Sequence, residues 1–508
     1  MSSQAHAQTV AQPEQELVKG LGLTSATTLV MGSMIGSGIF IVSADIARLV
    51  DSPGLLILAW AVTGFMTLTC ALAYGELAAM MPKAGGQYVY LRESLGPLWG
   101  FLYGWTMFMV IQTGTIAAVG MAFGKFLGLF FPSISSTNWI VHLWKAPAIH
   151  VGPMVLGNMD VGLSTQNLVA IIIVVALTTV NVFGIKTGAA IQNVFTFAKT
   201  AALLGLVIAG ALLFRNAAAA AANFSDFWSV GARHADLGIA SPFLLVATLL
   251  AVAQVGSLFA ADAWYNVTFT AGEVRNPRRN LPLSLALGTG AVILLYILAN
   301  IAYLNVLPMR GDPHGATVLA RGIQFATEDR VATAAMVAML GAAGGGLMAT
   351  AILVSTFGCN NGLILAGARV FYAMAKDGLF FHQAARVHPK YHTPVNALVV
   401  QAVWTSILCL SGSYGQLLDY TMFAVLVFYI LTILGLFVLR RTRPYAERPY
   451  RAFGYPLLPA IYMVMAIFID VVLLRYKPQY TWPGLMIVLV GIPVYFLTRR
   501  AGLAQQAD

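Results

Sequence analysis

Several stretches of at least 20 residues contain no Asp, Glu, Lys or Arg, and six of them give the clearest candidate spans in this chain of 508 residues. They are residues 54–75, 97–124, 161–185, 281–309, 420–439 and 478–498. About 20 helical residues cross the ~30 Å hydrocarbon layer of a bilayer, so each stretch is long enough for one spanning helix. Only 9% of the residues are charged, against about 25% in an ordinary soluble domain. The solvent of this chain is therefore lipid.

Six further apolar stretches carry interruptions, at about 26–47, 191–214, 240–268, 347–368, 394–412 and 454–474. The sequence thus predicts an all-α polytopic membrane protein with 12 transmembrane helices. The uncharged tract 331–368 is too long for a single span. We expect Gly344, Gly345 and Gly346 to separate a short surface helix from the eighth span, because glycine weakens a helix.

The basic residues predict the orientation of these helices. Of the 29 Lys and Arg residues, 19 fall on one set of connecting segments and 10 on the other. Since basic residues accumulate on the cytoplasmic side, both termini are expected in the cytoplasm, with the chain in the plasma membrane. Residues 1–24 have no apolar core of a signal peptide. The net charge of +10 thus reflects membrane insertion, and we expect no nucleic-acid partner.

Two spans are poor helices at their centres. The first contains Gly32, Gly36, Ser37 and Gly38, and the sixth is interrupted by Asp262. Close packing against a neighbouring helix would explain Gly32 equally well. Gly36 and Gly38 are too close in sequence for the small-xxx-small spacing that such helix packing uses. A carboxylate near the bilayer centre is costly unless it faces a watery cavity or a partner. Both spans are therefore predicted to unwind where they line a cavity.

The two interrupted spans lie five spans apart. If spans one to five and six to ten are structural repeats, the second repeat is inverted, and paired interruptions then indicate the binding site of a secondary transporter. Amide N–H groups at Gly36 to Gly38 would stabilise a carboxylate. We expect carbonyl groups near Met34, and between residues 259 and 262, to be free to accept from an ammonium group. Together they predict a receptor for an α-amino acid.

Several motifs resemble, in order, those of the amino acid, polyamine and organocation transporter (APC) superfamily, and in particular bacterial L-type amino acid transporters. They are Gly36–Phe40 (GSGIF), Gly75–Leu77 (GEL) with Pro82–Gly86 (PKAGG), Asn181–Lys186 (NVFGIK) with Gln192 and Asn193, Glu273–Pro277 (EVRNP), and Arg369–Ala375 (RVFYAMA). The resemblance implies a LeuT-like fold with an inverted 5+5 repeat that exchanges or takes up amino acids by alternating access. The expected organisation is a tail at 1–24, a ten-helix core at 25–440, two additional helices at 441–499 and a tail at 500–508.

The resemblance also implies roles for three residues. Phe259 corresponds to an aromatic gate over the substrate, and joins Met34, Gly36, Ser37, Gly38 and Asp262 as substrate-binding residues. Some family members carry aspartate at position 262, among them exchangers of cationic and of small neutral substrates. Lys199 corresponds to a lysine that reaches the site where sodium-coupled relatives hold a cation. The alternative for Lys199 is a side chain that extends to the membrane surface.

Partners and cofactors are constrained by what the sequence contains. Relatives that bind a glycoprotein heavy chain use a cysteine between spans three and four, whereas residues 125–160 contain none. We therefore expect no disulfide-linked heavy chain. The eight histidines lie in the tail or loops, which gives no reason to expect a metal, a cofactor or catalytic residues. The cysteines, Cys70, Cys359 and Cys409, lie in apolar stretches and are expected to be core residues.

Other interpretations stay open. A polyamine or organic-cation antiporter would share the fold, whereas a channel or a membrane-embedded enzyme would need a selectivity filter or a catalytic cluster that the motifs do not suggest. Asn360 and Asn361 suit either interhelical hydrogen bonds or a pocket lining. The segment 440–451 holds five arginines, which either follow the orientation rule or hold anionic lipid.

Overall fold

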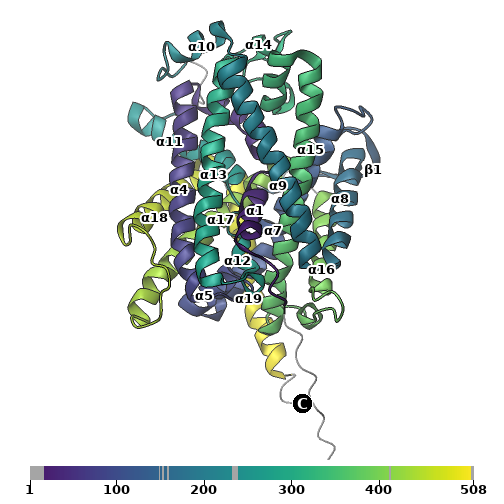
Figure 1. The fold of residues 1–508 in the computed structure, drawn as a ribbon, viewed down its shortest axis with the longest axis vertical. Coiled ribbons are helices and arrows are strands. Elements are labelled where there is room, and N and C mark those ends of the chain that lie inside the picture. Colours follow the sequence, from purple (N-terminus) through teal and green to yellow (C-terminus); the bar gives the residue numbers. More distant parts are fainter. Residues whose placement is uncertain are drawn as a thin grey trace, which may run out of the picture.

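The computed structural model describes residues 17–147, 149–151, 154–156, 159–231, 238–410 and 414–504. Within this part of the chain, eleven helices are long and apolar enough to cross a membrane, and they form an upright bundle (Figure 1). The one remaining expected span, 394–412, which is the ninth along the chain, corresponds to a helix of 15 residues, and residues 411–413 lie outside the described part. The expectation of an all-α polytopic membrane protein is confirmed.

The first half of the bundle contains four spans besides the interrupted first one. They are α4 (Pro53–Met80), α6 and α7 (Pro97–Thr106 and Gln112–Leu127) joined by a π-helical turn at Met107–Ile111, α8 (Thr165–Val182), and α9 (Ile185–Ile208) with a π-helical end at Ala209–Leu213. Shorter helices connect them: α5 (Gln87–Leu95) and α10 (Ala217–Phe224).

The second half follows the interrupted sixth span. It contains α13 (Pro277–Val306), α15 (Val331–Lys376), α16 (Val395–Cys409), α17 (Tyr414–Thr442), α18 (Leu457–Tyr476) and α19 (Pro478–Ala504). The connections hold α14 (Val318–Arg321) and 3₁₀ turns at Ala271–Glu273, Thr327–Asp329 and His382–Ala385. Because α19 continues to Ala504, the last helix extends five residues into the expected tail at 500–508, whose residues 505–508 lie outside the described part.

Both predicted interruptions are present. The first span consists of α1 (Leu23–Met34), a non-helical segment, α2 (Gly38–Ile41) and α3 (Ser43–Val50). The sixth consists of α11 (Pro242–Ala260), a non-helical segment and α12 (Asn266–Phe269). Ala263 in the second segment has a φ of 65°, a left-handed conformation that few non-glycine residues adopt. The helices therefore end where the glycines and Asp262 predicted.

The position of the break before the eighth span differs from the prediction. α15 is kinked at Gly341, with φ 66° and ψ −156°, and Gly344 to Gly346 are helical. Only glycine adopts the Gly341 conformation easily. A Cβ atom on Gly344 would lie 2.3 Å from the carbonyl oxygen of Met336. Gly344 thus allows the preceding short helix to pack closely, and it does not break the chain.

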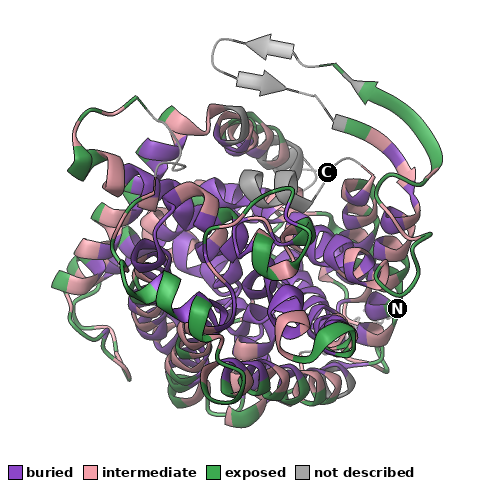
Figure 2. Cartoon of the chain, turned by 90° about the horizontal axis from the view of Figure 1, so that it is seen from above, coloured by how far each residue is buried: buried purple, intermediate pink, exposed green. Residues whose placement is uncertain are grey.

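The segment between the third and fourth spans forms strands that the sequence analysis did not predict. β1 (Trp139–Ala146) pairs antiparallel with β4 (Met159–Ser164), and β2 (Ile149–Val151) pairs with β3 (Met154–Leu156). Figure 2 shows β1 and β4 at the rim of the bundle. β1 is rich in aromatic and β-branched residues, which favour strands.

The first span lies at the centre of the bundle. In its most apolar window 78% of the residues are buried, whereas only 28% are buried in the window Thr481–Thr498 of α19. α1 packs against α9, α13 and α15, and buried residues fill the middle of the molecule (Figure 2). A side chain on α9, α13 or α15 can therefore reach the interruption in the first span.

Candidate substrate site

The interruption in the first span exposes backbone carbonyl groups, and a buried lysine contacts two of them. Lys199, on α9, is 1% exposed. Its ammonium group donates to the carbonyl oxygens of Gly32 and of Ile35, the latter at 2.7 Å, and to that of Ser355 on α15 at 3.4 Å. The side chain thus points into the bundle and does not extend to the membrane surface. Its ammonium group occupies a position ringed by oxygen atoms.

Residues of α15 satisfy neighbouring carbonyl groups. The hydroxyl of Ser355 lies 3.1 Å from the carbonyl oxygen of Ile35 and 3.0 Å from that of Gly36. The thiol of Cys359 lies 3.1 Å from the carbonyl oxygen of Ser33. A buried carbonyl without a partner is costly, so these contacts stabilise the non-helical conformation.

Tyr296, on α13, joins the two interrupted spans. Its hydroxyl lies 2.9 Å from the carbonyl oxygen of Met34, at the end of α1, and 3.1 Å from that of Ala260, at the end of α11. The Met34 carbonyl also accepts from the amide of Gly36 at 2.8 Å. The expectation that the carbonyl near Met34 is free is therefore wrong for this conformation, because both helix ends already have donors.

The start of α2 keeps the arrangement expected for a carboxylate receptor. Within the described residues, the amides of Gly38 and Ile39 have no hydrogen-bond acceptor. Ser37 precedes them and is 1% exposed. A Cβ atom on Gly38 would lie 2.6 Å from the Cβ and 2.7 Å from the Cα of Ala260. Gly38 therefore permits close contact between the two interrupted spans, a role that the sequence analysis did not assign to it.

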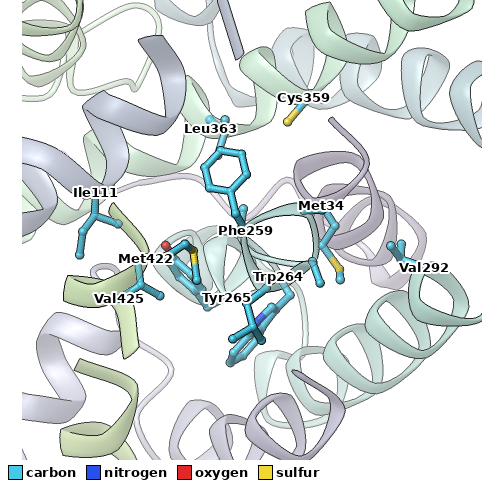
Figure 3. Close-up of a cluster of buried hydrophobic side chains, with 14 of the residues drawn as sticks. Met34, Ile111, Phe259, Trp264, Tyr265, Val292, Cys359, Leu363, Met422 and Val425 are labelled. Carbon is cyan, nitrogen blue, oxygen red and sulfur yellow. The ribbon is translucent and has the colours of Figure 1, made fainter. Parts of the chain in front are cut away.

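Phe259 lies in the last turn of α11 and is 8% exposed. In Figure 3 its ring extends toward the helix that carries Leu363, and Met34 lies in the same buried cluster. The ring thus lies next to the interruptions, where a gate would be needed. Gly36 lies opposite α15, since a Cβ atom there would be 3.1 Å from the sulfur of Cys359.

Asp262 is 7% exposed and faces α17. Its carboxylate accepts a short hydrogen bond from the hydroxyl of Tyr429. Beside it lies a cavity of about 10 Å³, also lined by Thr67, Cys70 and Tyr462, which is room for about one water molecule. The carboxylate thus has the polar partner that its depth in the membrane requires.

The structure thus places Lys199 against the first span and Gly38 against the end of α11, whereas Asp262 is directed to Tyr429 on α17. Sequence reasoning missed four partners of the expected site residues. They are Tyr296, Ser355, Cys359 in its contact with the first span, and Tyr429. The signal for the two tyrosines was a phenolic hydroxyl within an uncharged span, since such a group needs a partner when buried. Asn361 forms hydrogen bonds with Asn181 and the Gly188 carbonyl at 2.9 and 3.1 Å. Of the two roles considered for it, Asn361 therefore has that of an interhelical hydrogen-bond partner.

Ion pairs join neighbouring segments at both ends of the bundle. At the end that carries α12, Glu273 forms two hydrogen bonds with Arg369, of 3.0 and 3.1 Å, and both side chains are buried. The amides of Gly20 and Leu21 also donate to the Glu273 carbonyl. At the other end, Arg48 contacts Asp329 at 2.6 Å. These pairs therefore tie the ends of both interrupted spans to α15 and to the 3₁₀ turn before it.

A helical membrane bundle in which two interrupted spans face each other is the architecture of a secondary transporter. Comparison with known proteins agrees: a family model described as amino acid permease matches residues 21–496. The chain belongs to this amino acid permease family. It is accordingly a membrane transporter and not an enzyme.

Individual relatives cover almost the whole chain. It is 28% identical over 482 residues to the "Serine/threonine exchanger SteT" of Bacillus subtilis, covering 94% of this chain and 97% of the relative. It is 28% identical to the "b(0,+)-type amino acid transporter 1" of mouse, with 95% and 88% covered. It is 29% identical to the human "Large neutral amino acids transporter small subunit 2", with 95% and 80% covered. The resemblance deduced from the motifs is confirmed.

Proposed function

We propose that this chain is a secondary active transporter that carries amino acids across the plasma membrane by alternating access. The observation that carries the proposal is the contact between the two interruptions, in which Tyr296 bridges Met34 and Ala260. The amides at the start of α2 would hold the substrate carboxylate. The substrate ammonium would displace Tyr296 or share the carbonyl groups at the ends of α1 and α11. The names of the relatives support an amino acid substrate.

Lys199 supports a sodium-independent mechanism. Sodium sites are built from oxygen ligands, and in secondary transporters unwound carbonyl groups supply them. Here the ammonium group of Lys199 already binds the carbonyl oxygens of Gly32 and Ile35. A fixed positive charge at this position replaces a coupling cation and repels another. The chain is then an exchanger, or a permease coupled to protons.

The remaining roles and the organisation belong to the same proposal. Phe259 acts as the gate, Ser37 and Gly38 line the carboxylate site with Gly36, and Asp262 tunes the choice between cationic and neutral substrates. Residues 25–440 form the ten-helix core with inverted repeats, and 441–499 add two helices. Both termini lie in the cytoplasm, as the distribution of Lys and Arg favours. The chain works without a disulfide-linked heavy chain, since residues 125–160 contain no cysteine.

A proteoliposome screen tests this function. The purified chain is reconstituted in vesicles that are either empty or filled with one unlabelled amino acid, and uptake of each labelled amino acid is measured. Uptake that needs internal substrate identifies exchange, whereas uptake into empty vesicles that follows an imposed proton gradient identifies proton coupling. Uptake of polyamines but of no amino acid would favour the organic-cation antiporter and would contradict the proposal.

A further inference from the structure

An apolar groove lies between α17 and α18, away from the interrupted spans. It has a volume of about 410 Å³, and its lining includes Leu434, Phe437, Ala460, Val464 and Ile467. The groove occupies the last two turns of α17 and the first three of α18. It therefore opens close to the end of the bundle that carries the connection 443–456.

The groove faces outward, where the molecule meets its surroundings. Leu434 is 39% exposed, Val464 68% and Ile467 46%. In a membrane protein such a concave apolar surface contacts hydrocarbon chains, because water is absent at this depth. Since the surface is hollowed between two helices, one acyl chain can lie along it with contacts on both sides.

A free positive charge lies at the mouth of the groove. Arg441 lines it, is exposed, and has no acidic partner within the described residues. The neighbouring arginines are used differently. Arg440 and Arg448 both contact the buried carboxylate of Glu76, and Arg443 contacts Glu93. Three of the five basic residues of this segment thus hold the protein together, and Arg441 keeps its charge available.

We propose that the groove is a binding site for one anionic phospholipid, with an acyl chain between α17 and α18 and the phosphate on the guanidinium of Arg441. A guanidinium binds phosphate oxygens through paired N–H donors. In the proposed orientation this end faces the cytoplasmic leaflet, whose surface is negatively charged. Membrane insertion explains the number of basic residues, and the placement of an unpaired arginine beside an apolar groove is what sets Arg441 apart from Arg451.

Native mass spectrometry of the full chain in detergent tests the site, and its result depends on neither transport nor orientation. The probes are palmitoyl-oleoyl-phosphatidylglycerol and the zwitterionic palmitoyl-oleoyl-phosphatidylcholine. Arg441→Gln removes the charge, and Ala460→Trp fills the groove. Arg451→Gln is the matched control, because Arg451 is also exposed and without an acidic partner among the described residues but does not line the groove.

The parent is expected to bind one phosphatidylglycerol more tightly than phosphatidylcholine. Arg441→Gln should weaken the phosphatidylglycerol affinity about fivefold, as expected for one basic residue near a lipid surface, and Arg451→Gln should change it less than twofold. Ala460→Trp should remove the bound lipid. Equal affinity of the parent for both lipids, or equal effects of Arg441→Gln and Arg451→Gln, would overturn the proposal. Because Arg441 is exposed, its variant tests the site even if Ala460→Trp does not fold.

Discussion

Replacing Lys199 by methionine is the most informative change in the site. Methionine keeps an unbranched apolar side chain and removes the ammonium group, so the hydrogen bonds to the carbonyls of Gly32 and Ile35 are lost. The consequences for the two carbonyls differ. The Ile35 carbonyl keeps the hydroxyl of Ser355 as a donor. The Gly32 carbonyl loses its donor, because the amide of Gly36 donates to Met34 instead.

The size of the effect follows from that one carbonyl. A buried acceptor left without a donor costs about 1–3 kcal/mol, which corresponds to a factor of about 5 to 150 in an equilibrium. The non-helical conformation at the end of α1 becomes less populated by this factor, and the apparent affinity for substrate falls with it. Removing the ammonium group also removes the cost of dehydrating a charge. Substrate affinity is therefore a better measure than thermal stability.

The assay is uptake into proteoliposomes over a range of substrate concentrations, in sodium and in choline buffer. The parent should transport equally well in both buffers, and Lys199→Met should raise KM by about 5- to 150-fold. Lys145→Met is the control, since Lys145 is exposed on β1. A parental KM in Lys199→Met, or a steep sodium dependence of the parent, would refute the role assigned to this lysine.

Three further changes test other parts of the site. Gly38→Val places atoms within 2.7 Å of the α11 backbone, so it should abolish substrate binding but not membrane insertion. Gly205→Val is the control and should leave binding intact, because Gly205 lies on α9 with no neighbour within 4 Å. Glu273→Ala leaves the buried Arg369 without its partner, which should destabilise the protein by about 3–5 kcal/mol and lower its melting temperature. Asp262→Asn removes the carboxylate that accepts from Tyr429, and should change the relative uptake of cationic and neutral amino acids, or its pH profile.

Each of these expectations has a contrary result. Parental affinity in Gly38→Val would mean that the interrupted spans do not need close contact. Arg278→Gln removes an exposed ion pair. If Glu273→Ala had the same melting temperature as Arg278→Gln, loss of the buried Glu273–Arg369 pair would cost no more stability than loss of an exposed one. If Asp262→Asn keeps both the parental substrate spectrum and pH profile, only the main chain at this position takes part in transport.

Much of the fold could be predicted because membrane spans depend on local composition. Runs without charge predicted the helices, and glycines or a carboxylate within a run predicted where the helices end. The kink at Gly341 could not be located in this way, because the run Gly344 to Gly346 also predicts a break, whereas it is helical and its first two glycines allow close packing. The strands β1 to β4 lie outside the spans, where hydropathy gives no guidance.

The site could be predicted only in part for a similar reason. Met34, Gly38, Phe259 and Asp262 lie at the interruptions themselves, so local sequence indicated them. The residues that satisfy the exposed carbonyl groups, such as Tyr296, lie on helices far away in sequence. Their role depends on which faces of these helices contact the first span, and the packing of the whole bundle determines those faces. For the same reason the sequence suggested a free carbonyl at Met34, whereas the folded chain provides a donor.

Competition by substrate analogues tests the central claim most directly, namely that the two interruptions bind the α-amino and α-carboxyl groups of an amino acid. Uptake of the best labelled amino acid is measured in proteoliposomes with an excess of the unlabelled amino acid, its methyl ester, its N-acetyl derivative or the amine that lacks the carboxyl group. The account predicts that only the unmodified amino acid competes strongly. Equal competition by the ester or by the N-acetyl derivative would contradict it.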